Sequence, residues 1–379
     1  MNKLLKYFYY IRNFIAKILD KKFNFLIFFV TSKCNLKCKD CFFWKEINKA
    51  GDLTLEEIEK ISRSMPKIIA ILFSGGEPFL RLDLDKIIEV FYKNNKTCSF
   101  SIATNGTLID EIMMVIKVIL EKYQDIIITL NFSLDGFKKK HDDIKGVPGS
   151  YTRTVSCLNK LSSLRSKYPN LRITVNTVIL KDNIDEILNF AQYIQREFDV
   201  DGHYFEIIRG EPKDTLLKDV PYNKLLNLYW RLVKLQSYYI EKIIANDNMV
   251  SKFFNKLYYI SNFLLLYRYQ YRILSGKSRW PMQCLAGVVA GVLDYDGNFK
   301  LCELGKNIAK LQDYKYDFKK LWFSILRRKE LKRIKVKRCD CTHVCFIDQS
   351  YKHSMKVMLF IIPYLYLKYR IFGVKSVIK

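Results

Sequence analysis

Residues 25–41 have the sequence FLIFFVTSKCNLKCKDC, and this stretch decides the fold. Its first part, FLIFFVT, is apolar and rich in aromatic and β-branched residues, which is typical of a β-strand. Three cysteines, Cys34, Cys38 and Cys41, follow directly in one polar loop. Three thiolates on one loop can hold three corners of a [4Fe–4S] cluster and leave the fourth iron without a protein ligand. The stretch therefore predicts a strand whose C-terminal end carries a metal site.

The same strand pattern recurs five more times before residue 210. Further apolar runs occupy residues 68–73, 97–103, 126–133, 171–179 and 203–208, and helical patterns lie between them near 54–64, 82–94, 108–122, 151–168 and 183–198. Thr54 and Glu57 have the spacing of a capping box at the first helix. Strands that alternate with helices predict βα units and a parallel sheet. Six units are two short of a full (β/α)8 barrel, so we expect an open, partial (β/α)6 barrel of the α/β class.

Polar or turn-forming residues stand at the C-terminal end of nearly every predicted strand. They are Ser74-Gly75-Gly76-Glu77-Pro78, Thr104-Asn105-Gly106, Ser133-Leu134-Asp135-Gly136, Asn176 and Arg209-Gly210. Glycine, asparagine and aspartate are common turn residues, and this explains any one strand end well. Turn formation alone does not explain well why such residues stand at all six strand ends together with three cysteines. Barrel enzymes carry their sites on this rim, so we expect an active site there.

Composition divides the chain into five segments. Residues 1–23 predict a basic amphipathic helix, 24–210 the partial barrel, 211–280 an aromatic-rich helical connector, 281–350 a small cysteine-containing domain, and 351–379 an apolar and basic tail. Apolar residues make up 49% of the 379, enough for a sizeable core. The net charge of +26 favours anionic partners such as nucleic acid or anionic lipid, although biased codon usage explains it equally well. The charge is spread along the chain, which argues against nucleic acid.

A second group of cysteines lies near the C-terminal end of the chain. It consists of Cys284, Cys302, Cys339, Cys341 and Cys345. Between the first two, Asp294-Tyr295-Asp296-Gly297 is a strong hairpin signal. Clustering of this kind points to metal in a reducing compartment. A zinc site built from Cys339, Cys341, His343 and Cys345 is the competing interpretation, but these residues are too close in sequence to occupy four tetrahedral corners comfortably. Cys98 and Cys157 are expected to be core residues.

From the cysteine loop through Gly75-Gly76-Glu77-Pro78, the chain resembles the radical S-adenosylmethionine (radical SAM) superfamily, and the resemblance extends over roughly residues 24–350. It implies that Cys34, Cys38 and Cys41 hold a [4Fe–4S] cluster whose open iron binds S-adenosylmethionine. One electron then breaks a sulfur–carbon bond and leaves methionine and a 5′-deoxyadenosyl radical. The cofactor-binding residues implied are Gly75, Gly76, Glu77, Pro78, Thr104, Asn105, Ser133 and Asp135, with Asn176 and Arg209 as further contacts. Asp40 departs from the pattern, because an aromatic residue that packs on adenine usually precedes the third cysteine.

The second cysteine group resembles the SPASM/twitch extension that follows many radical SAM barrels. The resemblance implies a β-hairpin and a following helix that carry auxiliary [4Fe–4S] clusters. Five cysteines suffice for one such cluster with one to spare, so we expect Cys284, Cys302, Cys341 and Cys345 as ligands and Cys339 as the extra thiol.

The resemblance implies an oxidoreductase-like enzyme that abstracts hydrogen from a substrate carbon, with an electron donor such as flavodoxin or ferredoxin. Peptide or protein modification is the commonest theme among relatives with such extensions. The 24 residues before the first strand are too few for the winged peptide-recognition domain of many such relatives, so a sugar or lipid-linked substrate is the alternative. A nucleic-acid-binding iron–sulfur or zinc protein is the alternative from another class. Against it, the basic residues form no single stripe with interleaved aromatics.

The two ends of the chain bear on localisation. No signal peptide is evident, and the longest apolar run, Val357–Leu367, contains Pro363 and falls short of the ~20 residues of a membrane span. We therefore expect a cytoplasmic protein. Both ends pair an apolar face with lysine and arginine, and such helices most often pack on a core. Peripheral attachment to the inner face of the membrane is the alternative hypothesis.

Overall fold

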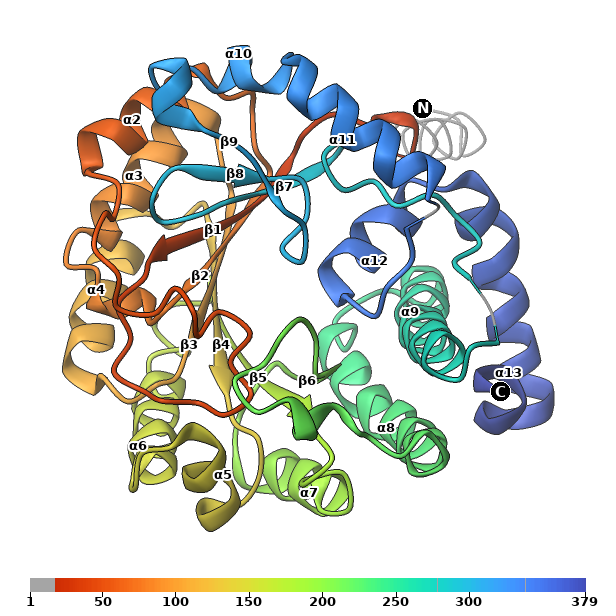
Figure 1. The fold of residues 1–379 in the computed structure, drawn as a ribbon. Coiled ribbons are helices and arrows are strands. Elements are labelled where there is room, and N and C mark those ends of the chain that lie inside the picture. The colour runs from red at the N-terminus through yellow and green to blue at the C-terminus, as the bar shows by residue number, and fades with distance from the viewer. Residues whose placement is uncertain (1–17, 278, 338) are drawn as a thin grey trace.

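The computed structural model describes residues 18–277, 279–337 and 339–379, so most of the predicted N-terminal helix lies outside the described residues. Its framework is one nine-stranded sheet with the order β6-β5-β4-β3-β2-β1-β7-β8-β9 (Figure 1). Six strands pair in parallel, and they are β1 (Phe25–Thr31), β2 (Ala70–Gly75), β3 (Ser99–Thr104), β4 (Ile127–Ser133), β5 (Leu171–Ile179) and β6 (Gly202–Ile207). All six predicted strands are confirmed, and so is the partial barrel.

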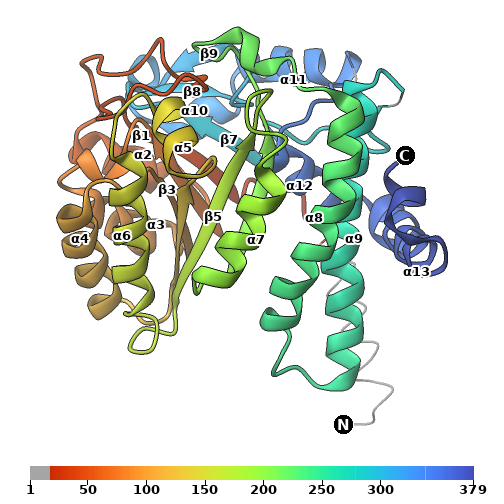
Figure 2. The same cartoon turned by 90° about the horizontal axis from the view of Figure 1, so that it is seen from below.

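Helices cover the outer face of these six strands (Figure 2). They are α2 (Leu55–Ser64), α3 (Leu84–Asn95), α4 (Ile109–Lys122), α5 (Lys138–Lys145), α6 (Ser150–Ser162) and α7 (Ile187–Glu197), and a 3-10 turn, η1 (Pro78–Leu80), follows β2. The capping box of α2 is confirmed, with the Glu57 amide donating to Thr54 Oγ1 at 3.3 Å and the Thr54 amide donating to Glu57 Oε2 at 2.8 Å. Sequence patterns missed α5.

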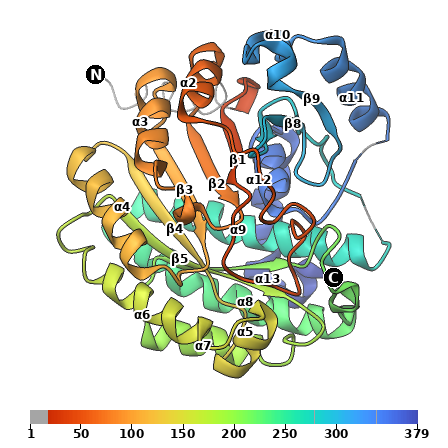
Figure 3. The same cartoon turned by 60° about the vertical axis from the view of Figure 1, so that its left-hand side comes forward.

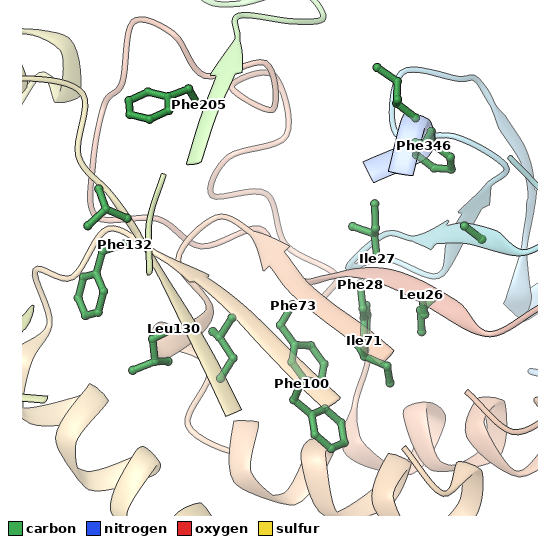
Figure 4. Close-up of a cluster of buried hydrophobic side chains, with 14 of the residues drawn as sticks. Leu26, Ile27, Phe28, Ile71, Phe73, Phe100, Leu130, Phe132, Phe205 and Phe346 are labelled. Carbon is green, nitrogen blue, oxygen red and sulfur yellow. The ribbon is translucent and has the colours of Figure 1, made fainter. Parts of the chain in front are cut away.

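The core lies between the strands and these helices. Leu26 and Phe28 point toward the helices, whereas Ile27 points the opposite way, toward Phe346 of the C-terminal segment (Figure 4). This follows from the alternation of side chains along a strand, and all three are fully buried. Cys157 is buried as expected, but the expectation for Cys98 was wrong: it is exposed because it precedes β3 at the edge of the core.

The C-terminal segment continues the same sheet beyond β1. Its strands are β7 (Ala290–Leu293), β8 (Asn298–Lys300) and β9 (Asn307–Lys310), and β7 pairs in parallel with β1 while β8 and β9 follow antiparallel. The predicted hairpin is confirmed, since the Asp294 amide donates to the Asn298 carbonyl at 2.8 Å. In the sheet β8 and β9 lie beyond β7, and Figure 3 shows α10 (Phe318–Trp322) and α11 (Ile325–Val336) outside them.

The helices that remain form a second wall. They are α8 (Tyr222–Ile243), α9 (Met249–Leu274), α12 (Val344–Lys352), the π-helical turn η4 (Val357–Ile361) and α13 (Ile362–Ile378). Two 3-10 turns lie in connecting segments: η2 (Thr215–Lys218) precedes α8, and η3 (Leu311–Tyr314) follows β9. Pro363 stands at the start of α13, directly after the π-helical turn η4, and the chain stays helical through it. Contrary to the expectation from sequence, Val357–Ile378 is therefore a helical stretch of 22 residues, long and apolar enough to cross a membrane by length and composition alone.

Candidate active site

The loop with Cys34, Cys38 and Cys41 takes its shape from backbone hydrogen bonds to distant segments. The amides of Lys37 and Lys39 donate to the carbonyls of Lys145 and Ile144 in α5, at 3.1 and 2.9 Å. On its other side, the Asp214 amide donates to the Lys39 carbonyl at 2.8 Å. The loop is therefore clamped on two sides, which fixes the positions of its thiols.

The three thiols share one partly buried site. Burial raises the pKa of each, to about 12 for Cys41, and backbone amides of Leu36 and Phe43 point at the sulfurs of Cys34 and Cys41. Amide dipoles of this kind stabilise metal-bound thiolates. Within the described residues no three His, Cys, Asp or Glu side chains meet closely enough to hold a single metal ion. The thiolates around a four-iron cluster lie further apart than those around a single metal ion. The arrangement of Cys34, Cys38 and Cys41 therefore fits a cluster better than a single ion.

The loop after β2 lies directly against the cysteine loop. The Gly76 and Glu77 amides donate to the carbonyls of Thr31 and Lys33 at 2.9 and 2.7 Å. A Cβ atom on Gly76 would lie 2.0 Å from the Lys33 carbonyl oxygen, so no other residue fits without moving backbone. A Cβ atom on Gly75, whose φ is +120°, would lie 2.4 Å from the Thr31 carbonyl oxygen. The glycine pair thus allows the ends of β1 and β2 to touch.

Glu77 joins this loop to the end of β3. Its buried carboxylate accepts hydrogen bonds from Thr104 Oγ1 at 2.8 Å, the Asn105 amide at 2.7 Å and the Phe79 amide at 3.3 Å. Burial raises the pKa of Glu77 to about 7, although the three hydrogen bonds by themselves would lower it. Glu77 and Thr104 are therefore hydrogen-bonded to each other in the interior. Asn105 stays near the surface and donates to Asn35 of the cysteine loop at 2.8 Å.

Asp135 and the unusual Asp40 flank a buried lysine. Lys145 Nζ lies 2.5 Å from Asp135 and 3.8 Å from Asp40, and all three side chains are at most 8% exposed. Burial opposes the charge on Lys145, but the two carboxylates hold its pKa well above the ordinary value. The other Asp135 oxygen accepts from the Val178 amide at 2.7 Å. Asp135 is thus engaged in the interior, while Ser133, two residues earlier, is only partly buried.

A second polar network joins the end of β6 to the C-terminal segment. Arg209 Nε donates to Glu303 Oε2 at 3.1 Å, and its guanidinium also pairs with Glu206 and lies 5.1 Å from the Phe42 ring centre. Glu303 pairs in turn with the His343 imidazole. Burial opposes its charge, but Arg209 and His343 lower the pKa of Glu303 to about 2. His343 therefore faces a carboxylate rather than the thiols, which weakens the zinc interpretation.

The second cysteine group shares the local geometry of the first. Backbone amides of Ala286, Leu304 and His343 point at the sulfurs of Cys284, Cys302 and Cys341, each two residues after its cysteine. Cys345 is partly buried and lies beside the Arg209 network, in the wall of a cavity. Cys339 is the exposed member of the group. The donor set thus fits a cluster held by the four less exposed thiols.

One cavity of about 400 Å³ lies between the barrel strands and the helices α9 and α12. Its wall includes Ser74, Asn131 and Asn176 from the strands, and Arg209, Glu303 and Cys345 at the side of the second cysteine group. Asn176 Oδ1 is buried without a hydrogen-bond partner among the described residues. An unpaired buried acceptor in a cavity wall is typical of a site that receives a polar ligand.

Comparisons with known proteins agree with this geometry. Residues 28–194 match the model of the radical SAM superfamily. An uncharacterized protein of Methanocaldococcus jannaschii is 30% identical over 209 residues, which cover 53% of this chain and 70% of that protein. This chain belongs to the radical SAM superfamily. Members use a [4Fe–4S] cluster and S-adenosylmethionine, which confirms these two cofactors as expected from the cysteine loop.

The characterised relatives of this radical SAM protein differ in their reactions. It is 30% identical to the Fe-coproporphyrin III synthase of Methanosarcina barkeri over 182 residues, 47% of this chain and 42% of that enzyme. It is 31% identical to the GTP 3′,8-cyclase of Clostridium botulinum over 189 residues, 46% and 56% of the two chains. The chain thus spans about half the length of these two enzymes, and the final reaction does not follow from the family.

Solved radical SAM structures share the fold over nearly the whole chain. Native anSMEcpe with bound AdoMet has a TM-score of 0.57 at 20% identity, covering 93% of this chain and 99% of that one. Streptococcus suis SuiB bound to precursor peptide SuiA has a TM-score of 0.53 at 18% identity, covering 86% and 71%. At these identities the likeness concerns the fold, which includes the C-terminal segment.

Sequence patterns missed several residues of the site. Lys145 belongs to the basic run KKKHDDIK and resembles a surface lysine. Glu303 follows Cys302 directly, and this position next to a predicted ligand is the one sequence feature that could have placed it in the site. Asn131 was detectable as a polar side chain within the apolar run IIITLNFS.

Proposed function

We propose that this radical SAM enzyme holds its cluster on Cys34, Cys38 and Cys41 and abstracts hydrogen from a carbon of a substrate in the 400 Å³ cavity. The cluster, when bound, supplies the electron that cleaves S-adenosylmethionine to methionine and a 5′-deoxyadenosyl radical. The cavity carries the proposal, because its wall runs from Ser74, beside the glycine pair, to Cys345 of the second cysteine group. A substrate there lies between the two groups of thiols.

The residues of the chain would then have distinct tasks. The Gly75–Pro78 loop, Asn105 and Ser133 would bind the cofactor, with Asn176 and Arg209 as contacts deeper in the cavity. Glu77 and Thr104 hold the cofactor loop to β3, and Asp135 with Lys145 holds α5 against the cysteine loop. These pairs act on the cofactor through the positions of the loops.

Peptide modification is the reaction class that the site supports best. SuiB is solved with a precursor peptide and anSMEcpe with a bound peptide, and both share the fold of this chain. The side chains of Asn131, Asn176 and Gln349 line the cavity. Amide side chains can donate to and accept from the backbone of a peptide. The volume is within the range of small-ligand sites and accommodates one or two residues of a peptide.

The second cysteine group is proposed to hold one auxiliary [4Fe–4S] cluster on Cys284, Cys302, Cys341 and Cys345. Its support is the repeated amide-to-sulfur geometry at three of the four and the position of the fourth, partly buried, beside Arg209. A cluster next to the cavity wall could accept the electron that a substrate radical loses on oxidation. An external donor such as flavodoxin or ferredoxin would reduce the first cluster.

The test is isotope transfer in anaerobically reconstituted enzyme with S-adenosylmethionine and a reductant. A deuterated peptide substrate should deliver deuterium into 5′-deoxyadenosine and change its own mass. Failure of fully reconstituted protein to form any 5′-deoxyadenosine would contradict the radical chemistry. Transfer from deuterated sugars but from no peptide would contradict the peptide assignment alone.

A matched pair of variants tests the cavity. Phe263 and Phe254 are on the same helix, α9, but only Phe263 lines the cavity. Phe263→Ala should raise the KM for the substrate about tenfold or more, because it removes a ring from the binding wall. Phe254→Ala should leave KM unchanged. Equal behaviour of the two variants would place the substrate elsewhere.

A further inference from the structure

The outward face of α13 is apolar where a helix of a soluble protein is ordinarily polar. Together with those of the adjoining turn η4, its exposed side chains recur at helical spacing and include Phe360 of η4 at 69%, Leu367 at 60% and Phe372 at 69% exposure. The other members are Leu359, Tyr364 and Ile371. Apolar residues on both faces of a helix are typical of helices that contact lipid or the interior of a large protein. Packing on the protein accounts for the apolar side chains on the inward face of this helix, but not for those on its outward face.

The N-terminal end of α9 extends this apolar surface. Met249, Val250, Phe253 and Phe254 are each more than half exposed, and the Phe253 ring lies 6.4 Å from the Tyr366 ring of α13. We call these four residues and the six exposed residues of η4 and α13 the α9/α13 face. Contiguous exposed apolar surface of this extent marks a binding surface.

Charge indicates what the face binds. No aspartate or glutamate occurs between residues 249 and 293 or between 349 and 379, although the whole chain has 38. Basic residues remain, and those on α9 and α13 or just after it are Lys252, Lys256, Arg268, Arg272, Lys368, Arg370, Lys375 and Lys379. Glu241 of α8 pairs with Lys256, and Asp247 precedes α9, so the charge near the face is mainly but not solely basic. Apolar side chains flanked by an excess of lysine and arginine match a bilayer surface with anionic headgroups.

The contacts of α13 decide how it meets a bilayer. Arg268 of α9 donates a hydrogen bond to the Val377 carbonyl, and Lys375 Nζ lies 4.8 Å from the Trp230 ring of α8. Gly373, at φ +75°, interrupts the helical backbone. The helix is thus held on the outside of the α8–α9 pair, which it crosses: α8 and α9 run down the view in Figure 2, whereas α13 is seen nearly end-on. We propose that the α9/α13 face lies flat on an anionic membrane surface, without crossing it.

This orientation has a consequence for the cavity. Phe263, Leu266 and Tyr267 of α9 line the cavity. The helix that forms one cavity wall would therefore also contact the membrane, at its N-terminal end.

Co-sedimentation with vesicles tests the proposal with the full-length, cluster-loaded enzyme. Vesicles of phosphatidylcholine with phosphatidylglycerol should bind the enzyme at low salt, and high salt or pure phosphatidylcholine should weaken binding. F360E/L367E should lower the partition coefficient about tenfold or more, because two apolar contacts become anionic. The matched control is M114E/V118E, which changes two exposed apolar residues of α4, 58% and 46% exposed, on the far side of the barrel.

Several outcomes would overturn the proposal. One is recovery of the wild-type enzyme in the supernatant at low salt, and another is equal loss of binding in the two double variants. Resistance of the bound enzyme to alkaline carbonate would show that α13 crosses the membrane. Dimerisation in lipid-free solution that F360E/L367E abolishes would assign the face to a second copy. Unchanged circular dichroism and 5′-deoxyadenosine formation in F360E/L367E show that the variant is folded.

Discussion

The two cysteine groups are similar in local geometry and opposite in construction. Cys34, Cys38 and Cys41 come from one loop after β1. The second group comes from three segments, which meet because β7 pairs with β1 and because the Leu285 amide, before β7, donates to Ser350 Oγ of α12 at 3.0 Å. In both groups, backbone amides two residues further along point at sulfur. The comparison shows that the same amide-to-sulfur geometry recurs at most of these cysteines, whether one short loop or several distant segments bring the cysteines together.

The largest expected effect is loss of the first group. Replacing Cys34, Cys38 and Cys41 by Ala should abolish 5′-deoxyadenosine formation and reduce the iron content from about eight atoms to about four. Iron analysis and chromatography of the nucleoside measure both. Cofactor cleavage that persists in this variant would show that the catalytic cluster lies elsewhere.

Loss of the second group should separate cleavage from product formation. With Cys284, Cys302, Cys341 and Cys345 replaced by Ala, 5′-deoxyadenosine should still form, but product should not. Cys339→Ala should retain both clusters, because this thiol is exposed. Stoichiometric zinc with only about four irons in the wild-type protein would reject the auxiliary cluster.

The buried ion pairs beside the two groups allow a smaller, quantitative comparison. Lys145→Met should cost about 3–5 kcal/mol of unfolding free energy, because it leaves the Asp135 carboxylate buried without its cation. Denaturant titration measures this, and K145M/D135N should recover part of the loss. Lys139→Met, at an exposed position of the same helix, is the control. A cost for K145M no greater than that for K139M would show that the pair does not hold α5.

Two glycines provide the smallest contrast. Gly76→Ala should cost about 2–3 kcal/mol and slow cofactor cleavage, because its Cβ would meet the Lys33 carbonyl oxygen at 2.0 Å. At Gly305 the nearest atom is the Cys302 carbonyl oxygen at 3.1 Å, so Gly305→Ala should cost under about 1 kcal/mol. Thermal unfolding of the two variants compares the costs. Equal decreases in Tm for the two variants would mean that the backbone around Gly76 adjusts to a Cβ atom as easily as the backbone around Gly305.

Several elements could not be predicted from sequence for identifiable reasons. The helix α5 has little apolar periodicity, since in KKKHDDIK only Ile144 is a large aliphatic residue. Its formation depends on docking to the cysteine loop and on the Asp135–Lys145 pair. In α13, Pro363 suggested an interruption because residue patterns do not show where a helix begins. Glu77 resembled a ligand-binding carboxylate, and only the folded chain shows that Thr104 and Asn105 engage it.

Sequence by itself determined the six βα units, the hairpin and the family of this chain. Each depends on residues close together in sequence: alternating apolar runs, a turn signal, and three cysteines followed by a glycine pair. Tertiary structure decided the pairing of β7 with β1, the Arg209–Glu303 contact and the partners of Asp40 and Asp135. The Arg209–Glu303 contact and the Asp40–Lys145 pair each join residues about a hundred positions apart. Local periodicity encodes the elements, but only packing selects which side chains from distant elements become neighbours.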